Sequence, residues 1–356
     1  MRLRLLCAAG ALVVSLGPPG RQAQAADAPA AAAQAADPRA AALTLAAAPG
    51  AWLDALRQVV LDPFAKATGI AVRGVPFDGG IGLLRLRTEA GGGGSGVPWD
   101  VVQMPGDTLL LGCGEGLLAP LDFARLGGTA RLPGKALSRC GVGLAQASLV
   151  LAWDRDKFQG TPSWADFWDV AKYPGKRGLR RGVRGNLEIA LMADGVAPGD
   201  VYKTLATPDG VDRAFHKLDQ LKPYLVWWRT PGEATRILGS GEVLLTSAFD
   251  GQVAVANRVG GRNFGIQRTG SLAEVLSLAI VAGRPQQDDA YRLIEYAIDP
   301  ARERALSAVV PYPGLTKTSP GAPAVPSPPG GVMIDDNFWH DNLDRLSQRF
   351  EAWLAH

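Results

Sequence analysis

Helical segments alternate with short extended segments along the first part of this 356-residue chain. Residues 51–67 carry apolar side chains at helical spacing, and an extended run begins at Ile70. A second helix is expected over 82–89, and 99–103 reads as a buried parallel strand. Regular alternation of helix and strand is typical of a domain in which helices cover a sheet, so the pattern predicts an α/β fold.

The later segments indicate that the chain passes between two lobes more than once. Residues 141–153 form an apolar run that is long for one strand and is suited to carry the chain from one lobe to the other. A second block of helices and strands follows, with a strand at 243–247. A strand at 276–281 then returns to the first lobe, and 337–355 has the apolar stripe of a helix.

The N-terminal segment has the three parts of a signal peptide. Arg2 and Arg4 precede an apolar stretch, and Ala23-Gln24-Ala25 offers small residues at a cleavage point. The apolar stretch is shorter than the ~20 residues that span a bilayer, which disfavours the alternative of a membrane anchor. We therefore expect a cleaved signal peptide over 1–25, an Ala-rich linker over 26–48, and export to the periplasm.

The charge balance argues against a nucleic-acid partner. The formal net charge is +3, and three of the 37 basic residues lie in the leader, where there is no acidic residue. The remaining 34 basic residues match the 34 acidic ones. A neutral chain with scattered arginines lacks the concentrated basic surface that binding to nucleic acid requires.

Two cysteines lie beyond the leader, Cys113 and Cys140. In an oxidising compartment such a pair favours a disulfide over two buried thiols, and a loop of this length adds ~3 kcal/mol of stability. The chain has no CxxC motif and only three histidines, so we expect neither a metal site nor redox catalysis.

Motifs of catalysis are missing from the sequence. The glycine run at 91–96 is not followed by Lys-Ser or Lys-Thr and is no phosphate-binding loop. No GxSxG, HExxH or SxxK motif occurs. We therefore expect a binding protein without a cofactor, and keep an exported hydrolase or lyase as the alternative.

Several segments resemble the solute-binding proteins of bacterial ABC importers, most nearly the spermidine/putrescine-binding branch. They are, in chain order, Phe64-Ala65-Lys66-Ala67-Thr68-Gly69-Ile70, Trp99-Asp100-Val101-Val102, Pro162-Ser163-Trp164-Ala165-Asp166-Phe167-Trp168, Tyr173-Pro174-Gly175-Lys176-Arg177-Gly178, Ser240-Gly241-Glu242-Val243, 290–300 and Phe338-Trp339. The resemblance covers roughly residues 45–356 and depends on the order and spacing of motifs that are individually weak.

This resemblance implies a two-lobe periplasmic binding protein of type II, with an interlobe ligand cleft and a hinge. The first lobe is expected to comprise 49–150 and 270–315, and the second 151–269 and 316–356. It also implies a monomer that captures a small polar ligand and delivers it unchanged to an ABC permease in the inner membrane.

The resemblance also implies ligand-binding positions. They are Trp52, Phe249, Asp250, Glu274 and His340. A polyamine needs carboxylates for its ammonium groups and aromatic faces for its methylenes, which fits this set. Other roles stay open, since Phe249 also suits a core and Asp250 also suits the start of a helix.

Arginines depart from the polyamine pattern. Where the polyamine binders carry acids after the strand that begins near Gly178, this chain has arginines that include Arg181 and Arg184. A guanidinium repels a polyamine but holds a carboxylate or phosphonate through two parallel hydrogen bonds. The alternative ligand is therefore an anionic or zwitterionic metabolite such as an amino acid or phosphonate, unless the arginines form a solvated face.

Overall fold

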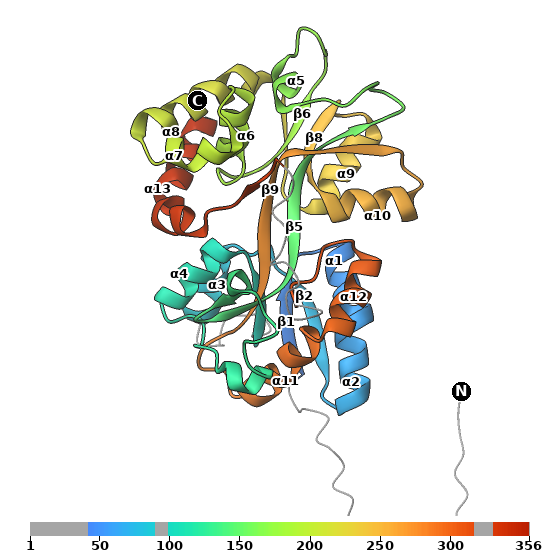
Figure 1. Ribbon diagram of the computed structural model, residues 1–356, viewed down its shortest axis with the longest axis vertical. Coiled ribbons are helices and arrows are strands. Elements are labelled where there is room, and N and C mark those ends of the chain that lie inside the picture. The colour runs from blue at the N-terminus through green and yellow to red at the C-terminus, as the bar shows by residue number, and fades with distance from the viewer. Residues whose placement is uncertain (1–41, 90–98, 317–329, 356) are drawn as a thin grey trace, which may run out of the picture. The chain divides into compact units, whose positions relative to one another are not determined.

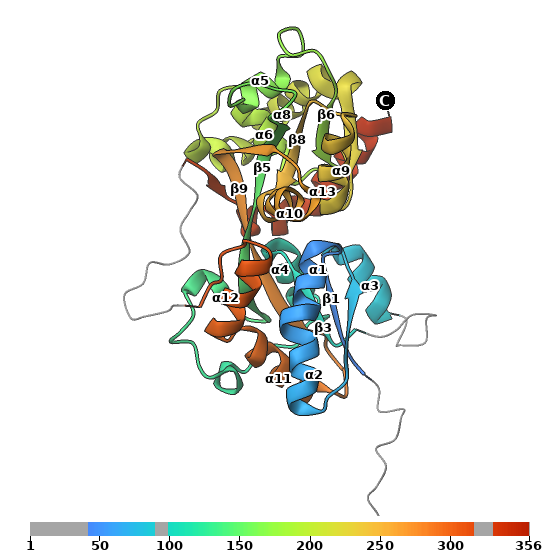
Figure 2. The ribbon, with the colours of Figure 1, turned by 90° about the vertical axis from the view of Figure 1, so that its right-hand side faces the viewer.

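The computed structural model describes residues 42–89, 99–316 and 330–355. The predicted signal peptide and the glycine run at 91–96 lie outside these residues. Within these residues, ten strands form one sheet, whose main path runs β2-β1-β3-β9-β5-β8-β6-β7. Helices pack on both faces of each half of this path (Figures 1 and 2), so the predicted α/β fold is confirmed.

Two strands belong to both halves of the sheet. They are β5 (Gly141–Asp154) and β9 (Phe264–Ile280), which pair antiparallel along most of their length. Figure 1 shows both running from one lobe into the other. Their register shifts between Gly143 and Ala145 and again between Leu149 and Leu151, which are the bulges that let a strand pair bend and twist.

The first lobe is named here for the elements around β1 to β3. These elements are β1 (Leu43–Ala47), α1 (Ala51–Leu56), the π-helical η1 (Arg57–Leu61), α2 (Asp62–Thr68), β2 (Val72–Pro76), α3 (Ile81–Glu89), β3 (Val101–Met104), α4 (Gly106–Gly114), α11 (Gln287–Ala297) and α12 (Pro300–Val309). The short β4 (Leu137–Ser138) pairs with β5. Strand β3 is parallel to β1 and antiparallel to β9.

The second lobe is named for the elements around β6 to β8. These are α5 (Trp164–Trp168), β6 (Arg177–Arg180), α6 (Asn186–Ala193), α7 (Val201–Leu205), α8 (Pro208–Leu221), β7 (Leu225–Trp228), α9 (Pro231–Ser240), β8 (Leu245–Phe249), α10 (Asp250–Gly260) and α13 (Asp336–Ala355). The short β10 (Val332–Met333) pairs with β9. No helix within the described part of the chain is long and apolar enough to cross a membrane.

The structure corrects two of the sequence predictions. Residues 43–47, expected within the linker 26–48, form β1, which lies fully buried between β2 and β3. Alanine-rich composition suggested a spacer, but a strand buried on both faces carries no polar alternation to reveal it. The strand expected over 276–281 begins twelve residues earlier, at Phe264.

Arg177 is a fully buried cation that organises the second lobe. Its guanidinium donates to the backbone carbonyl oxygens of Phe167, Tyr173 and Gly175, at 2.7, 2.6 and 2.6 Å. A buried charge is tolerated when its donors are all satisfied in this way. The motif at 173–178 therefore stabilises the second lobe through the hydrogen bonds of Arg177.

A disulfide joins Cys113, on α4, to Cys140, just before β5. It closes a loop of 27 residues, and the two Cα atoms lie 5.7 Å apart. The bond lies within the first lobe, where it fixes the end of α4 against the start of β5.

Candidate ligand-binding site

A cleft of about 780 Å³, including space open to solvent, lies between the two lobes. Residues that follow the carboxyl ends of β2, β3, β6, β7 and β8 line it. Ligands of open α/β sheets bind at this end of the strands, because loops and helix starts converge there. The lining residues central to the chemistry are Trp52, Phe77, Asp78, Gln103, Arg180, Arg229, Phe249, Glu274 and Tyr312.

Aromatic rings form one wall of the cleft. The rings of Trp52, on α1, and Tyr312, after α12, lie 5.3 Å apart between centroids. The indole N–H of Trp52 donates to Oε1 of Gln103, on β3, at 2.8 Å. Phe77 and Phe249 are also buried and complete an apolar surface suited to methylene groups.

Arg180 is one of two arginines in the cleft lining, and it lies against the aromatic surface. It ends β6, is half-buried, and its guanidinium carbon lies 5.7 Å from the centre of the Phe249 ring. Within the described residues its side chain makes no hydrogen bond or ion pair. Burial lowers the pKa of Arg180, with the charge of Glu274 opposing, yet a guanidinium stays protonated in a protein. Five N–H donors are therefore available to an anionic group in the cleft.

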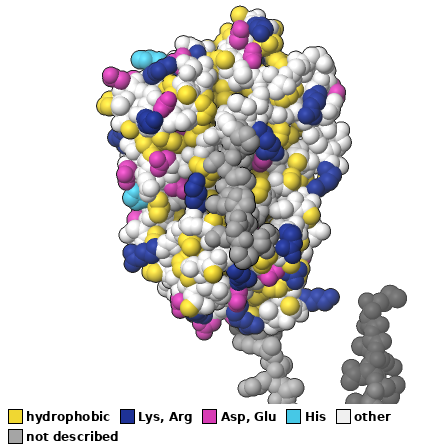
Figure 3. Space-filling model, viewed as in Figure 1, with side chains coloured by type: hydrophobic (Ala, Val, Ile, Leu, Met, Phe, Trp, Pro, Cys, Tyr) yellow, Lys and Arg dark blue, Asp and Glu magenta, His cyan; other side chains and the backbone are white. Residues whose placement is uncertain are grey.

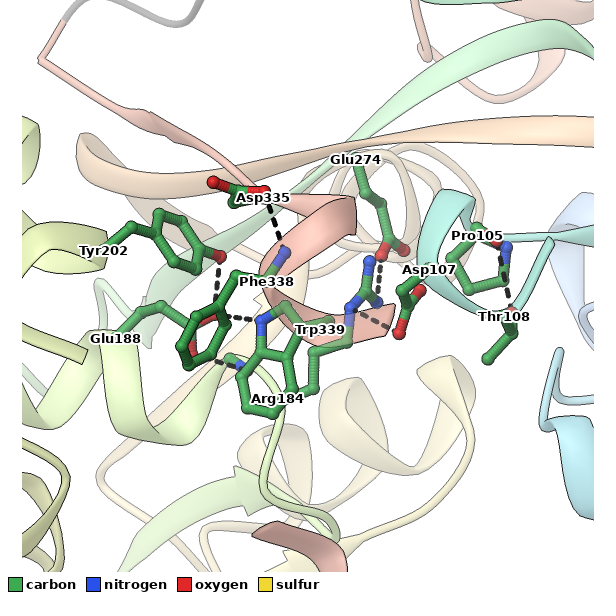
Figure 4. Close-up of polar contacts among 11 residues, drawn as sticks. Pro105, Asp107, Thr108, Arg184, Glu188, Tyr202, Glu274, Asp335, Phe338 and Trp339 are labelled. Atoms are coloured by element: carbon green, nitrogen blue, oxygen red, sulfur yellow. Dashed lines mark hydrogen bonds and ion pairs between the residues drawn. The ribbon is translucent and has the colours of Figure 1, made fainter. Parts of the chain in front are cut away.

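Glu274 is the buried acid of the cleft, and a second arginine neutralises it. The guanidinium Nη1 of Arg184 lies 2.5 Å from Oε2 of Glu274, and its Nε lies 3.3 Å from Oδ2 of Asp107 (Figure 4). The three side chains are all at least 88% buried, at 9, 12 and 1% exposed. Among the described residues, only the exposed Asp78 adds another carboxylate to the lining, so this lining is not strongly acidic.

The structure brings together three of the seven predicted binding residues. Trp52, Phe249 and Glu274 line the cleft, and Arg184 lies directly behind Glu274.

Three other predicted residues lie outside the cleft lining, each with a partner elsewhere. Asp250 accepts the backbone N–H of Ser148 and pairs with Arg268 at 2.8 Å, at the start of α10. Arg181 makes a two-bond pair with Glu351 of α13, with both distances 2.7 Å. His340 is 40% exposed and contacts Asp341. Asp250 is the first residue of α10, but the N-cap of this helix is Phe249 and no side chain caps it.

Several lining residues had no place in the sequence prediction. Arg180 was visible only as one of a group of arginines, although its position at the end of a strand was a usable signal. Gln103 follows the motif at 99–102 by one residue, and Tyr312 sits in a proline-rich stretch that reads as a loop. Side chains of these kinds reveal a site only when the fold brings them together. Among the described residues, no group of three or more His, Cys, Asp or Glu is placed to hold a metal ion.

Comparison with known proteins gives this cleft its context. Residues 60–330 match the family described as bacterial extracellular solute-binding protein. The chain belongs to this family. It is 38% identical over 324 residues to the gamma-aminobutyric acid-binding protein of Pseudomonas aeruginosa, which covers 88% of this chain and 91% of the relative. It is 24% identical over 321 residues to the spermidine/putrescine-binding periplasmic protein 1 of Haemophilus influenzae, at 85 and 86% coverage.

A solved structure supports the same assignment. The binding protein MotA of A. tumefaciens B6, in complex with glucopine, superposes with a TM-score of 0.79 at 25% identity. The match covers 88% of this chain and 99% of that one. The chain is therefore the solute-binding component of an ABC transporter, with the two-lobe fold of periplasmic binding proteins. Its family is one of transport proteins and not of enzymes, and the resemblance to the polyamine branch is the more distant one.

Proposed function

We propose that this solute-binding protein captures a small zwitterionic amino acid of the 4-aminobutanoate type in the periplasm and passes it unchanged to an ABC permease. The observation that carries the proposal is the unpaired guanidinium of Arg180 in a cleft whose buried acid, Glu274, is already neutralised by Arg184. The predicted leader at 1–25 supports export, and we propose that the protein acts as a monomer.

The ligand's two ends would meet different parts of the cleft. A carboxylate fits Arg180, because a guanidinium offers two parallel N–H donors to two oxygens. Its methylenes would lie against Trp52 and Phe249, and its ammonium group would meet Asp78 or the shielded oxygens of Glu274. The identity of 38% with a relative named for gamma-aminobutyric acid supports this choice of ligand.

A polyamine is the second candidate, supported by the aromatic walls and the more distant polyamine-binding relative. It carries at least two positive charges, and Arg180 and Arg229 would repel both. Glu274 offers little compensation, since Arg184 already holds it at 2.5 Å. The charges of the cleft therefore favour the zwitterion.

Isothermal titration of the purified mature protein tests the proposal. We expect 4-aminobutanoate to bind with micromolar or tighter affinity and putrescine to bind far more weakly. Arg180→Met should weaken 4-aminobutanoate binding by about 100-fold, because a hydrogen-bonded charge contributes roughly 1.5–3 kcal/mol.

Arg181→Met is the matched control for this titration. Arg181 neighbours Arg180 in the sequence, but it is paired with Glu351 and absent from the cleft lining. Its loss should leave the affinity unchanged. Tighter binding of putrescine than of 4-aminobutanoate, or equal effects of the two substitutions, would show that the proposed ligand is wrong.

A further inference from the structure

We propose that Arg184 is a positioning residue that couples the ligand cleft to closure of the two lobes. It does so through an interlobe latch, defined as Arg184 with the carboxylates of Asp107, Glu274 and Asp336. The proposal goes beyond ligand identity and depends only on capture of a ligand between the lobes.

The first contact of the latch joins three separate elements. Arg184 lies after β6 in the second lobe, Asp107 lies on α4 in the first lobe, and Glu274 lies on the crossing strand β9. Figure 4 shows the guanidinium between the two carboxylates. Glu274 also lines the cleft. The side chain of Arg184 therefore contacts both a residue of the cleft wall and Asp107 of the opposite lobe.

The second contact of the latch joins the start of α13 to the start of α4. The Asp336 carboxylate lies so close to Gly106 that a Cβ added there would come within 2.0 Å of its Oδ2. The Asp336 carboxylate therefore lies at the first turn of α4, which begins at Gly106. A carboxylate at the start of a helix interacts favourably with the helix dipole and with the N–H groups that lack a partner within the helix.

A buried carboxylate anchors both contacts to the second lobe. Glu188, on α6, is fully buried and accepts the backbone N–H of Gly185 at 2.9 Å. It also accepts the hydroxyl of Tyr202 and the indole N–H of Trp339, each at 2.7 Å (Figure 4). Gly185 follows Arg184, and Trp339 lies in the first turn of α13 after Asp336. Glu188 therefore ties Arg184 and Asp336, the two latch residues of the second lobe, to each other.

The charge balance makes Arg184 indispensable to the closed arrangement. Two carboxylates contact its guanidinium, those of Asp107 and Glu274, and Asp336 adds a third negative charge nearby. Asp107 is 1% exposed, and neither of its side-chain oxygens accepts a hydrogen bond from a described residue. When the lobes separate, Asp107 regains contact with water and needs no counter-ion. Loss of Arg184 would leave uncompensated buried acids in the closed form, which is the costly case for a buried ion pair.

The experiment measures closure directly, in the absence of added ligand. Nitroxide labels are attached at Lys66→Cys in the first lobe and Lys176→Cys in the second, both of which are exposed. Interlabel distances are then measured by electron–electron double resonance. The wild type should show a population at the short distance of the closed form, and Arg184→Met should reduce that population at least tenfold.

Arg181→Met again serves as the matched control, since its ion pair with Glu351 stays within the second lobe. Its distance distribution should equal that of the wild type. A wild type without the short-distance population, or an Arg184→Met variant indistinguishable from it, would overturn the proposal. If circular dichroism shows that Arg184→Met does not fold, Asp107→Asn takes its place, with the same expected direction.

The interlabel distance is the readout that a merely structural role would not move, and binding affinity is read beside it because Arg184 also pairs with Glu274 of the cleft. Apparent affinity falls in proportion to the closed fraction, so 4-aminobutanoate binding should weaken by the same factor as the short-distance population. Removing an excess acid in the double variant Arg184→Met/Asp107→Asn should restore part of that population. If 4-aminobutanoate does not bind the wild type, the proposed ligand fails while the distance measurements still decide the latch.

Discussion

Trp52 and Gln103, which both line the ligand cleft, are joined by a hydrogen bond of 2.8 Å between the indole nitrogen and the side-chain oxygen. Trp52 is 5% exposed and Gln103 is 4% exposed, so water cannot replace the bond. The contact ties α1 to β3 and fixes the plane of the ring that faces the ligand.

Trp52→Phe should therefore weaken both folding and binding. The substitution leaves the buried oxygen of Gln103 without a donor, which costs about 1–3 kcal/mol of the free energy of unfolding. It also frees the ring to turn, and we expect binding of 4-aminobutanoate to weaken several-fold in calorimetry. Trp227→Phe is the control, because Trp227 is half-buried among rings of the second lobe, away from the cleft. Equal losses of affinity in the two variants would contradict the prediction.

Gly106→Ala should impair closure while leaving the fold intact. The added Cβ would meet the Asp336 carboxylate, which reaches Gly106 only when α13 lies against α4. We expect at least tenfold weaker ligand binding with a nearly unchanged midpoint of thermal unfolding. Gly114→Ala, in the same helix, meets nothing within 4 Å and should bind normally with stability equal to the wild type or up to ~1 kcal/mol higher. Identical affinities of the two variants would contradict the steric argument.

Glu303 should make the protein less stable as the pH rises. This residue is 4% exposed and accepts the backbone N–H and the hydroxyl of Thr316, each at 2.8 Å. Burial raises the pKa of Glu303 from 4.5 to about 7. Between these two pKa values the folded state keeps a proton on Glu303 that the unfolded state has lost. The contribution of Glu303 to the free energy of unfolding is therefore largest below about pH 4.5 and is lost as the pH rises to about 7.

The shift corresponds to about 3 kcal/mol of the free energy of unfolding. Urea unfolding of Glu303→Gln, which keeps a neutral side chain, should lack this part of the decrease between about pH 5 and about pH 8. The carboxyl of Asp336, whose pKa burial raises to about 6, adds to the decrease in both proteins and cancels in the comparison. Parallel pH profiles for wild type and variant would show that Glu303 titrates normally.

The disulfide should contribute to stability and not to binding. Closing a loop of 27 residues restricts the unfolded chain and stabilises the fold by about 3 kcal/mol. Cys113→Ala/Cys140→Ala should lose this amount in urea unfolding. Its affinity for 4-aminobutanoate should stay the same, since neither cysteine lines the cleft. A changed affinity would mean that the bond positions the site.

The fold was largely predictable from the sequence because periodicity and capping residues are local signals. Ser163, for example, is of a residue type favoured as an N-cap, and it caps α5, where Asp166 completes the capping box. The strand β1 escaped prediction because Leu43-Thr44-Leu45-Ala46-Ala47 differs little in composition from the alanine-rich tract before it. Its burial between β2 and β3 comes from residues that lie far along the chain.

The site was harder to predict because its chemistry depends on which charges are already paired. Arg180, Arg181 and Arg184 look alike in sequence, yet one is free, one is paired on the surface and one is buried between acids. Their pairing depends on the positions of Glu351, Asp107 and Glu274, which belong to three separate elements. The family resemblance indicated the positions of Trp52, Phe249 and Glu274, which the structure places in the cleft lining.

The shared strands β5 and β9 restrict how a protein of this kind can change its ligand. Strand β9 pairs with β3 of the first lobe, β5 pairs with β8 of the second, and the two strands pair with each other. A protein fragment that contains one lobe alone would therefore expose unpaired sheet edges. Recombination that swaps whole lobes between paralogues would have to cut through this strand pair at matching bulges. Point substitution around the cleft, by contrast, would alter the ligand surface and leave the shared strand pair intact.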